Sequence, residues 1–399
     1  APSTGRSEGS SPQKEKIMHF SLLQNVKILE ENGAVRQLGS LMKEAGYRHA
    51  FLVCDEGIVR MGLAGKIQDI IAAEGLSCTL YDKVQPDPPA FLVDEGAALC
   101  RSAGCDCVIA AGGGSSIDTA KGINILRFNE GHILDYAAPA RKMTPAHGLI
   151  VIPTTSGTGS ELSNGLIISD TERGIKAPIL AVEGMSEYAI LDPELTAGMP
   201  PMLTLITGLD VFSHACESYM SVLASSMTDM ICEKIMEDVA AFLPRAVRQG
   251  SDKEARERML CCASLGGWML ACASAHVGHS IAHIIGATYH IPHGRACAFS
   301  LPPTLEFMAA TCPEKVKKVG MLLGAAFYGS ESPEQIGQRT ARAYRDFCAG
   351  LGLTELGVKK PGDAELDALA DAVAHEPLAT LCPVPVTKEN MRPLLEKMF

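Results

Sequence analysis

Short apolar runs alternate with stretches of helical periodicity through the first half of the chain. Continuous apolar runs closed by turn residues predict buried strands, whereas apolar residues spaced three and four apart predict helices. Strands are predicted at 50–54, 78–81, 107–111, 149–153 and 189–191, and helices at 61–74 and from the Pro-rich turn 86–89 to about 103. Strands separated by helices predict a largely parallel sheet that is covered on both faces.

The pattern changes after Pro200 and Pro201. From there to the C-terminus the chain is typical of successive amphipathic helices, with breaks predicted at 251–252, 302–303, 330–333 and 359–363. We therefore expect an α/β plus all-α fold, with an α/β domain at residues 17–198 and a helical domain at residues 199–399. Residues 1–16 are polar and rich in Ser and Gly, so a disordered tail is expected there.

Composition narrows the class of protein. The formal net charge of −11 argues against nucleic acid or an anionic membrane as the partner, because both need clustered Lys and Arg. No apolar run reaches the roughly 18–20 residues that span a bilayer. The 14 cysteines include no CxxC pair and match neither a disulfide scaffold nor a thiolate zinc site. We interpret them as reduced core residues of a cytoplasmic protein that acts on a small molecule.

A glycine-rich turn lies between a predicted strand and a predicted helix. Residues 110–121 read AAGGGSSIDTAK. The three glycines allow a ligand to approach the backbone, and Ser115 and Ser116 can cap the helix. The free N–H groups of a helix start attract phosphate. The spacing is not GxGxxG, so a phosphate site and a tight structural turn are equally good interpretations of this segment alone.

A second polar turn, residues 153–161, reads PTTSGTGSE and also follows a strand. Thr154, Thr155 and Thr158 offer hydroxyl groups beside flexible glycines, although an ordinary Ser/Thr-rich loop looks the same. Two such turns after parallel strands favour a ligand at the carboxyl ends of those strands. Asp55 follows the first predicted strand, where a carboxylate can accept a hydrogen bond from a ribose 2′-OH; a plain turn aspartate is the alternative.

Five of the eleven histidines fall within eighteen residues, namely His276, His279, His283, His290 and His293. His279 and His283 are four residues apart, so they share a face of a helix, and upstream Asp210 and His214 have the same spacing. One carboxylate with several imidazoles suits Fe²⁺ or Zn²⁺. A single helical histidine is more often structural, but this density in an apolar background favours a metal site.

Taken together, these segments resemble the iron-containing (group III) alcohol dehydrogenases. The resemblance covers roughly residues 20–395, and the segments occur in the family's order: GGGSSIDTAK (112–121), IPTTSGTGSE (152–161), AILDPELT (189–196), TGLDVFSHACESY (207–219) and GHSIAHIIGATYHIPHG (278–294). It implies a Rossmann-like nucleotide-binding α/β domain, a helical metal-binding domain, and a metal in the cleft between them, an architecture similar to that of dehydroquinate synthase.

The resemblance also implies a role for individual residues. It implies that Fe²⁺, with Zn²⁺ as the alternative, is held by Asp210, His214, His279 and His293. It places His283 beside the nicotinamide, as a proton relay or as a residue that only orients its neighbours. The residues that it implies for binding NAD(H) are Asp55, Gly113, Gly114, Ser115, Asp118, Thr154, Thr155, Thr158 and Lys176.

Several positions depart from the family pattern. Gly165 stands where a bulky residue is frequent, Leu270 replaces an aromatic residue, and His276 replaces a glycine; LCPVP at 381–385 replaces Asn-Pro-Arg. The first three changes argue against a simple ethanol-like substrate. We expect a substrate pocket formed by Asn164, Gly165, Leu270 and His276, in which His276 and Asn164 recognise a polar or anionic substituent.

The expected activity is hydride transfer between NAD(H) and a small alcohol, aldehyde or ketone. Two alternatives stay open: a hydroxyacid–oxoacid transhydrogenase that keeps NAD bound, and a lyase similar to dehydroquinate synthase. The lyase needs a pocket lined by several Lys and Arg, and the histidine segment offers only Arg295. By analogy with the family, a homodimer or larger homo-oligomer is expected.

Overall fold

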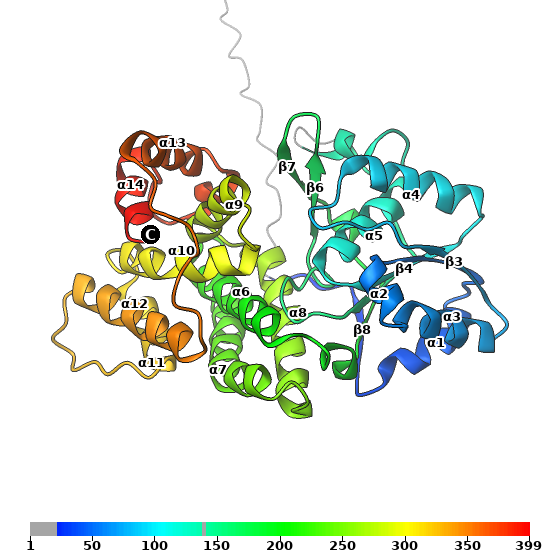
Figure 1. The fold of residues 1–399 in the computed structure, drawn as a ribbon, viewed down its shortest axis with the longest axis horizontal. Coiled ribbons are helices and arrows are strands. Elements are labelled where there is room, and N and C mark those ends of the chain that lie inside the picture. Colours follow the sequence, from blue (N-terminus) through cyan, green and yellow to red (C-terminus); the bar gives the residue numbers. More distant parts are fainter. Residues whose placement is uncertain (1–21, 138–140) are drawn as a thin grey trace, which may run out of the picture.

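The computed structural model describes residues 22–137 and 141–399, so the tail expected at 1–16 lies outside the described residues. The described chain forms two halves that lie side by side, with all strands in one half and helices alone in the other (Figure 1). The last strand ends at Leu191, and the first helix of the helical half begins at Pro201. We propose that the domain boundary expected at 198/199 lies in this connection.

Six strands form one parallel sheet in the order β1-β8-β5-β4-β2-β3. Their bounds are β1 Lys27–Glu30, β2 His49–Val53, β3 Ser77–Tyr81, β4 Cys107–Gly112, β5 Leu149–Pro153 and β8 Tyr188–Leu191. A separate antiparallel hairpin consists of β6 Gly165–Asp170 and β7 Ile175–Leu180. The sequence did not predict β1, β6 or β7, because these short strands are partly exposed and lack a continuous apolar run.

Helices cover both faces of the parallel sheet. They are α1 Leu38–Glu44, α2 Glu56–Arg60, α3 Leu63–Ala73, α4 Ala90–Ser102 and α5 Gly114–Phe128. Successive strand residues point to opposite faces, so Phe51 and Val53 of β2 pack in the cluster with α4 and α5, whereas Ala50 and Leu52 pack with α1 and α3. Because both faces are buried, the central strands read as continuous apolar runs.

Chain order and sheet order disagree at one place. From β2 the chain moves outward to β3 and then crosses back to β4 on the other side of β2. In open parallel sheets, ligands bind outside the carboxyl ends of the strands at such a switch point. The carboxyl ends of the adjacent strands β2, β4 and β5 are therefore the natural place for a cofactor.

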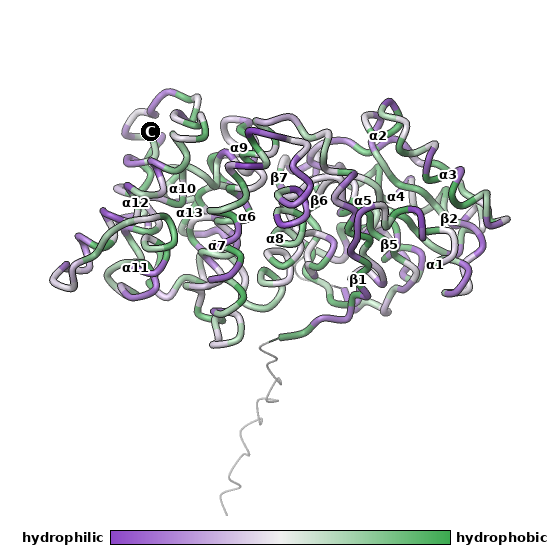
Figure 2. Tube along the Cα trace, turned by 90° about the horizontal axis from the view of Figure 1, so that it is seen from below, coloured by the Kyte–Doolittle hydropathy of each residue, from purple (hydrophilic) through white to green (hydrophobic). Residues whose placement is uncertain are grey.

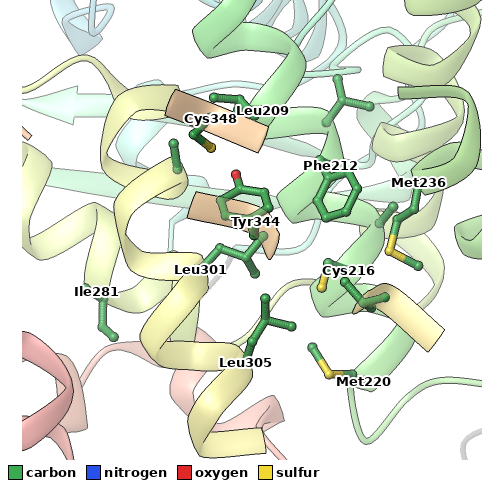
Figure 3. Packing of buried hydrophobic residues seen from close by; sticks show 14 of the residues in the cluster. Leu209, Phe212, Cys216, Met220, Met236, Ile281, Leu301, Leu305, Tyr344 and Cys348 are labelled. Atoms are coloured by element: carbon green, nitrogen blue, oxygen red, sulfur yellow. The ribbon is translucent and has the colours of Figure 1, made fainter. Parts of the chain in front are cut away.

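The helical half packs around one large apolar cluster, part of which Figure 3 shows. Its helices are α6 Pro201–Met220, α7 Ser226–Arg248, α8 Lys253–Cys272, α9 Val277–Tyr289, α10 His293–Met308, α11 Pro313–Leu322, α12 Pro333–Gly350, α13 Asp363–Ala374 and α14 Lys388–Glu396. Phe212 of α6 and Tyr344 of α12 lie with their ring centroids 5.4 Å apart within this cluster. Hydrophilic and hydrophobic segments alternate along both halves, as expected for helices with one buried face (Figure 2).

One predicted break is wrong. Pro302 and Pro303 do not end a helix but lie inside α10, where both are buried. A proline removes one hydrogen bond of the helix, at a cost of about 3 kcal/mol. The packing of α10 against α6, α9 and α12 opposes that cost and maintains the helix.

Within the described residues, no single helix is long and apolar enough to cross a membrane. Only the pair α8 and α9 reaches that length and composition together, and these two helices are bent by 108° relative to one another.

Candidate active site

Helix α6 places apolar residues in the core and polar residues of the candidate site on a different face. Leu209, Phe212 and Cys216 belong to the apolar cluster (Figure 3). Asp210 and His214, four residues apart, share a different face of the helix. Burial of the apolar residues therefore fixes the direction in which the carboxylate and the imidazole point.

Three imidazole rings surround one oxygen of Asp210. The Oδ1 atom lies 3.5 Å from Nε2 of His214, 3.7 Å from Nε2 of His279 and 3.5 Å from Nε2 of His293. These residues come from α6, α9 and the first residue of α10. Asp210 is buried, yet its Oδ1 atom has no hydrogen-bond partner among the described residues. A buried carboxylate oxygen normally has a partner, so this arrangement fits a cation held between the four side chains.

Two of the three imidazoles favour the neutral form. Burial lowers the pKa of His214 to about 4 and that of His293 to about 3, so both rings have free lone pairs near pH 7. At His279 the pKa is instead raised, because the neighbouring Cys297, Glu217 and Asp210 outweigh the effect of burial. Burial opposes ionisation of Asp210, but the neighbouring imidazoles outweigh it and hold the pKa well below its usual range. One carboxylate and neutral imidazoles are donors that suit Fe²⁺ or Zn²⁺.

Glu217 orients His279, and the sequence analysis missed it. Its Oε1 atom lies 2.6 Å from Nδ1 of His279, which leaves Nε2 of that ring facing Asp210. Its Oε2 atom accepts the backbone N–H groups of His276 at 2.9 Å and His279 at 3.2 Å. Burial raises the pKa of Glu217, but His279 outweighs it and the result is about 2. The signal was available, because Glu217 follows Asp210 by seven residues on the same helix.

A second carboxylate, Glu376, orients His283. Its Oε1 atom lies 3.0 Å from Nδ1 of His283, and its Oε2 atom accepts a hydrogen bond of 2.7 Å from the Ser280 hydroxyl. Glu376 precedes the short 3-10 helix Pro377–Leu381, far from the histidines in sequence, and no local pattern marks it. The side chains of His283 and His293 are 32% and 39% exposed, against 3–4% for His214 and His279, so the cluster is accessible from this side.

Cys297 also belongs to the cluster, although the sequence analysis assigned it to the core. Its Sγ atom lies 3.7 Å from Nε2 of His279 and 3.5 Å from Nε2 of His293. His293 and Cys297 are four residues apart in α10, the same spacing that marked the other two pairs.

The candidate cofactor residues gather at the carboxyl ends of three adjacent strands. Asp55 follows β2, the glycine turn follows β4, and Thr154 follows β5. Asp55 also begins α2, where its Oδ1 atom accepts a hydrogen bond of 3.1 Å from the Ile58 N–H group. A Cβ atom built on Gly112 would lie 3.9 Å from Oδ2 of Asp55, so this carboxylate borders the glycine turn.

The two polar turns contact each other. A Cβ atom on Gly113 would lie 3.2 Å from the hydroxyl oxygen of Thr155, and one on Gly114 would lie 2.8 Å from the methyl group of Thr158. The expectation that serine caps the following helix is wrong: α5 begins at Gly114 with Gly113 as its N-cap, and no side chain caps it. Ser115 therefore lies in the first turn, where uncapped N–H groups suit a phosphate.

Glycines also bring the second turn against the helical half. Gly159 and Gly267 of α8 meet so closely that a Cβ atom on Gly267 would lie 1.9 Å from the backbone oxygen of Gly159. Gly159 has a φ of +61°, which glycine adopts without strain. The turn that carries Thr155 and Thr158 is thus held directly against a helix of the other half.

Two residues that were expected to bind the cofactor have partners within the protein. Asp118 accepts hydrogen bonds from the Ser160 hydroxyl at 2.6 Å and from the Ile167 N–H group at 2.9 Å. It therefore ties α5 to the second polar turn and to β6. Lys176 lies on β7 and forms a 2.6 Å ion pair with Asp87.

The residues expected to form the substrate pocket lie on three separate segments of the chain. Asn164 and Gly165 lie at the start of β6, where the Gly165 carbonyl accepts a hydrogen bond of 2.8 Å from Lys121. Leu270 lies near the end of α8 and is partly buried. His276 has no exposed surface, and its Nδ1 atom lies 3.5 Å from Oε2 of Glu217. Neither of its ring nitrogens has a hydrogen-bond partner among the described residues.

Comparison with known proteins identifies the family. Residues 25–193 match the model of iron-containing alcohol dehydrogenase, and residues 204–399 match that of the C-terminal part of the Fe-containing alcohol dehydrogenase family. The chain belongs to the iron-containing alcohol dehydrogenase family. The chain is 33% identical to alcohol dehydrogenase 4 of Saccharomyces cerevisiae over 369 residues, which are 92% of this chain and 95% of the relative.

Two further relatives are reductases. The chain is 32% identical to sulfoacetaldehyde reductase of Bilophila wadsworthia over 379 residues, covering 94% of this chain and 97% of that protein. The crystal structure of sulfoacetaldehyde reductase from Bifidobacterium kashiwanohense in complex with NAD⁺ matches with a TM-score of 0.86 at 26% identity, covering 96% of this chain and 99% of that one. The expected family, fold class and enzyme class, an iron-type alcohol dehydrogenase or aldehyde reductase, are confirmed. Membership of this family argues against the alternative of a lyase similar to dehydroquinate synthase.

Proposed function

We propose that the protein interconverts a small alcohol and its aldehyde or ketone, with NAD(H) as the hydride carrier and one divalent metal ion per chain. The observation that carries this proposal is the Asp210 oxygen, which is buried, lacks a hydrogen-bond partner and is surrounded by three imidazole nitrogens. It is supported by the glycine and threonine turns at the carboxyl ends of the central strands.

Asp210, His214, His279 and His293 would hold the metal, and the turns at Gly113 and Thr155 would hold the cofactor pyrophosphate. When both are bound, the metal polarises the substrate oxygen and the nicotinamide exchanges the hydride. The protein contributes the orientation of these groups. Glu217 fixes the tautomer of His279, and a carboxylate in this position typically strengthens metal binding.

His283 would move the proton. Its ring is partly exposed beside His293, at a ring-centroid distance of 5.4 Å, and its Nδ1 atom faces the Glu376 carboxylate. That contact leaves Nε2 free to exchange a proton with the substrate hydroxyl or with water. Glu376 stabilises the imidazolium that forms when His283 accepts the proton.

The metal proposal is tested by elemental analysis after reconstitution with Fe²⁺ or Zn²⁺. We expect about one ion per chain in the native protein and a large loss in His279→Ala, whose ring lies between Asp210 and Glu217. Reconstituted native protein that retains no divalent ion would refute the proposal.

The choice of NAD(H) rests on Asp55 beside the glycine turn. A carboxylate there accepts a hydrogen bond from the ribose 2′-OH and repels a 2′-phosphate. Asp55→Gly should narrow the preference for NADH over NADPH, measured as the ratio of the two kcat/KM values. Equal efficiency of the native protein with both cofactors would contradict this assignment.

A second candidate is a substrate that carries an acidic group. Two relatives are named sulfoacetaldehyde reductases, and the buried His276 has two ring nitrogens without partners. The test compares kcat/KM for propanal with that for an acidic aldehyde of similar length, in the native protein and in His276→Ala. If propanal reacts better and the substitution leaves the ratio unchanged, the acidic-substrate candidate is wrong.

The same assay tests the transhydrogenase alternative. A dehydrogenase changes the absorbance of free NADH when a single carbonyl substrate is present, whereas a transhydrogenase needs a second hydroxy acid or oxo acid and leaves free NADH constant. A cytoplasmic location and a homo-oligomeric state are further proposals, the latter open to light scattering in solution.

A further inference from the structure

A buried lysine lies behind the two polar turns. Lys121 is on α5, about two turns after its first residue Gly114, and is 1% exposed. Its Nζ atom donates hydrogen bonds to the Ser163 carbonyl at 2.9 Å, to the Ser163 hydroxyl at 3.2 Å and to the Gly165 carbonyl at 2.8 Å. An ammonium group has three donors, so all of them are used to hold residues 163–165.

An ammonium group is costly in this place. Burial lowers the pKa of Lys121 to about 8, although the nearby carboxylates of Asp118 and Glu161 favour the charged form. Among the described residues, its hydrogen bonds nevertheless go to the segment 163–165 and not to either carboxylate. A buried charge is favourable only where its partners offset the loss of water, and here the partners are oxygens of one short segment.

Asp118, one turn before Lys121 on the same helix, holds the two ends of a slightly longer segment. Its Oδ1 atom accepts a hydrogen bond of 2.6 Å from the Ser160 hydroxyl, and its Oδ2 atom accepts one of 2.9 Å from the Ile167 N–H group. Residues 160–167 are thus fixed to α5 at both ends by the carboxylate and in the middle by the ammonium group. The large sheet does not hold this segment, because the hairpin β6–β7 is separate from it.

The turn that leads into this segment rests on the two helices beside the candidate metal ligands. A Cβ atom on Gly157 would lie 2.8 Å from the Cβ atom of Thr207, which is one turn before Asp210 on α6. A Cβ atom on Gly266, next to the glycine of α8 that meets this turn, would lie 3.7 Å from the Cβ atom of His214. The segment held by α5 therefore continues directly into a turn that lies between the glycine turn and the candidate metal ligands.

We propose that Lys121 is a positioning residue for hydride transfer, which fixes Asn164 and Gly165 at the start of β6 relative to the cofactor turn and the metal ligands. This inference rests on the proposed function and adds to it a residue that acts through the segment it holds. Hydride transfer requires the reacting atoms to be close and aligned, so a small displacement of the pocket wall reduces the rate of this step.

The test compares the native protein with Lys121→Met, which keeps the length of the side chain and removes its three donors. Turnover of propanal is measured at saturating NADH, at a temperature well below the Tm of the variant, so that only folded protein contributes. We expect kcat to fall about 10–100-fold, the range expected when a positioning segment moves by up to about 1 Å. Metal content and the Kd for NADH should stay unchanged, because Asp118 and the contact with α8 still hold the cofactor turn.

An isotope effect distinguishes positioning from a loss of stability. NADH that carries deuterium at the transferred position slows hydride transfer and no other step. If Lys121→Met misaligns the reacting atoms, its isotope effect on kcat should equal or exceed that of the native protein. A smaller isotope effect would show that a different step has become slow, and this would overturn the inference.

Lys66→Met is the matched control. Lys66 is an exposed residue of α3 in the same half of the chain, so its substitution should leave kcat and the isotope effect unchanged. A milder variant, Ser163→Ala, removes one of the three contacts of Lys121 and should lower kcat about 3–10-fold, the worth of one hydrogen bond. If Lys121→Met does not fold, Ser163→Ala decides the question with the same two measurements.

The outcomes separate this inference from the proposed function. A native protein that reduces propanal, together with a folded Lys121→Met whose kcat is unchanged, overturns the positioning role and leaves the proposed function standing. The same holds for an unchanged kcat in Ser163→Ala where Lys121→Met does not fold. A metal-reconstituted native protein that transfers no hydride from NADH to any small aldehyde or ketone overturns both.

Discussion

The contact between Gly159 and Gly267 makes the substitution Gly267→Ala a sharp test of how the two halves are joined. A Cβ atom at residue 267 would lie 1.9 Å from the Gly159 oxygen and 2.5 Å from its carbonyl carbon, so the turn would have to withdraw by about 1.5 Å to restore an ordinary contact. Overpacking of this kind typically costs about 1–3 kcal/mol. The upper end applies here, because both obstructing atoms belong to backbone.

The assay is thermal unfolding followed by NADH binding. At about 2.1 cal/mol/K of unfolding entropy per residue, a loss of 3 kcal/mol lowers Tm by about 3–4 °C in a chain of this length. The turn also carries Thr155 and Thr158, which contact the glycine turn after β4, so withdrawal should weaken NADH binding as well. A displacement of about 1 Å at a positioning segment can reduce the rate by a factor of about 100.

Gly65→Ala provides the matched control. Gly65 lies in α3, and a Cβ atom there meets nothing within 4 Å. The same substitution should stabilise the protein by about 0.5–1 kcal/mol, because alanine loses less conformational entropy in a helix. If Gly267→Ala is as stable as Gly65→Ala and binds NADH as tightly as the native protein, the close contact does not hold the turn and the reasoning is refuted.

Three further predictions concern single side chains. Glu217→Gln should reduce metal affinity about 10–100-fold, measured by competition with a chelator, and unchanged affinity would remove its orienting role. Glu376→Gln should lower kcat and shift its pH profile by changing His283, whereas a purely structural role would lower stability alone. Cys348→Ala tests a buried thiol whose pKa burial raises to about 12. The folded state keeps this proton while the unfolded state loses it above the ordinary pKa near 9, so stability is lost as pH rises from about 9 to about 12. Between about pH 8 and about pH 10, the native free energy of unfolding should therefore fall by about 1 kcal/mol more than that of the variant. Equal slopes in urea unfolding would contradict this.

The sheet was predictable because its central strands are buried on both faces. The predicted strands at 107–111 and 149–153 are β4 and β5, the latter with the same bounds. The edge strand β1, KILE, has no such signal, because three of its four residues are exposed. The hairpin β6–β7 alternates buried and exposed residues over only six positions on each strand, and no strand was predicted there.

The candidate metal cluster was predictable in part, because helical spacing places residues four apart on one face. That rule marked Asp210 with His214 and His279 with His283, and it applies equally to His293 and Cys297, which was assigned to the core with the other cysteines. Proline residues predicted the helix ends less well. Pro302 and Pro303 do not interrupt α10, because the residues of that turn are buried and packing maintains the helix.

Residues that reach the site from distant segments lie beyond what local patterns can predict. Glu376 joins His283 across 93 positions, and no local pattern marks it. Glu217 joins His279 across 62 positions; its spacing from Asp210 along α6 could mark it as a site residue, but not its pairing with His279. These partners nevertheless matter for the cluster. A carboxylate that binds Nδ1 orients an imidazole that presents Nε2 inward, and it also favours cation binding. His214 is the exception, since its buried Nδ1 has no partner among the described residues. Glu217 therefore orients His279 firmly, whereas the orientation of His214 depends on packing and on its contact with Asp210.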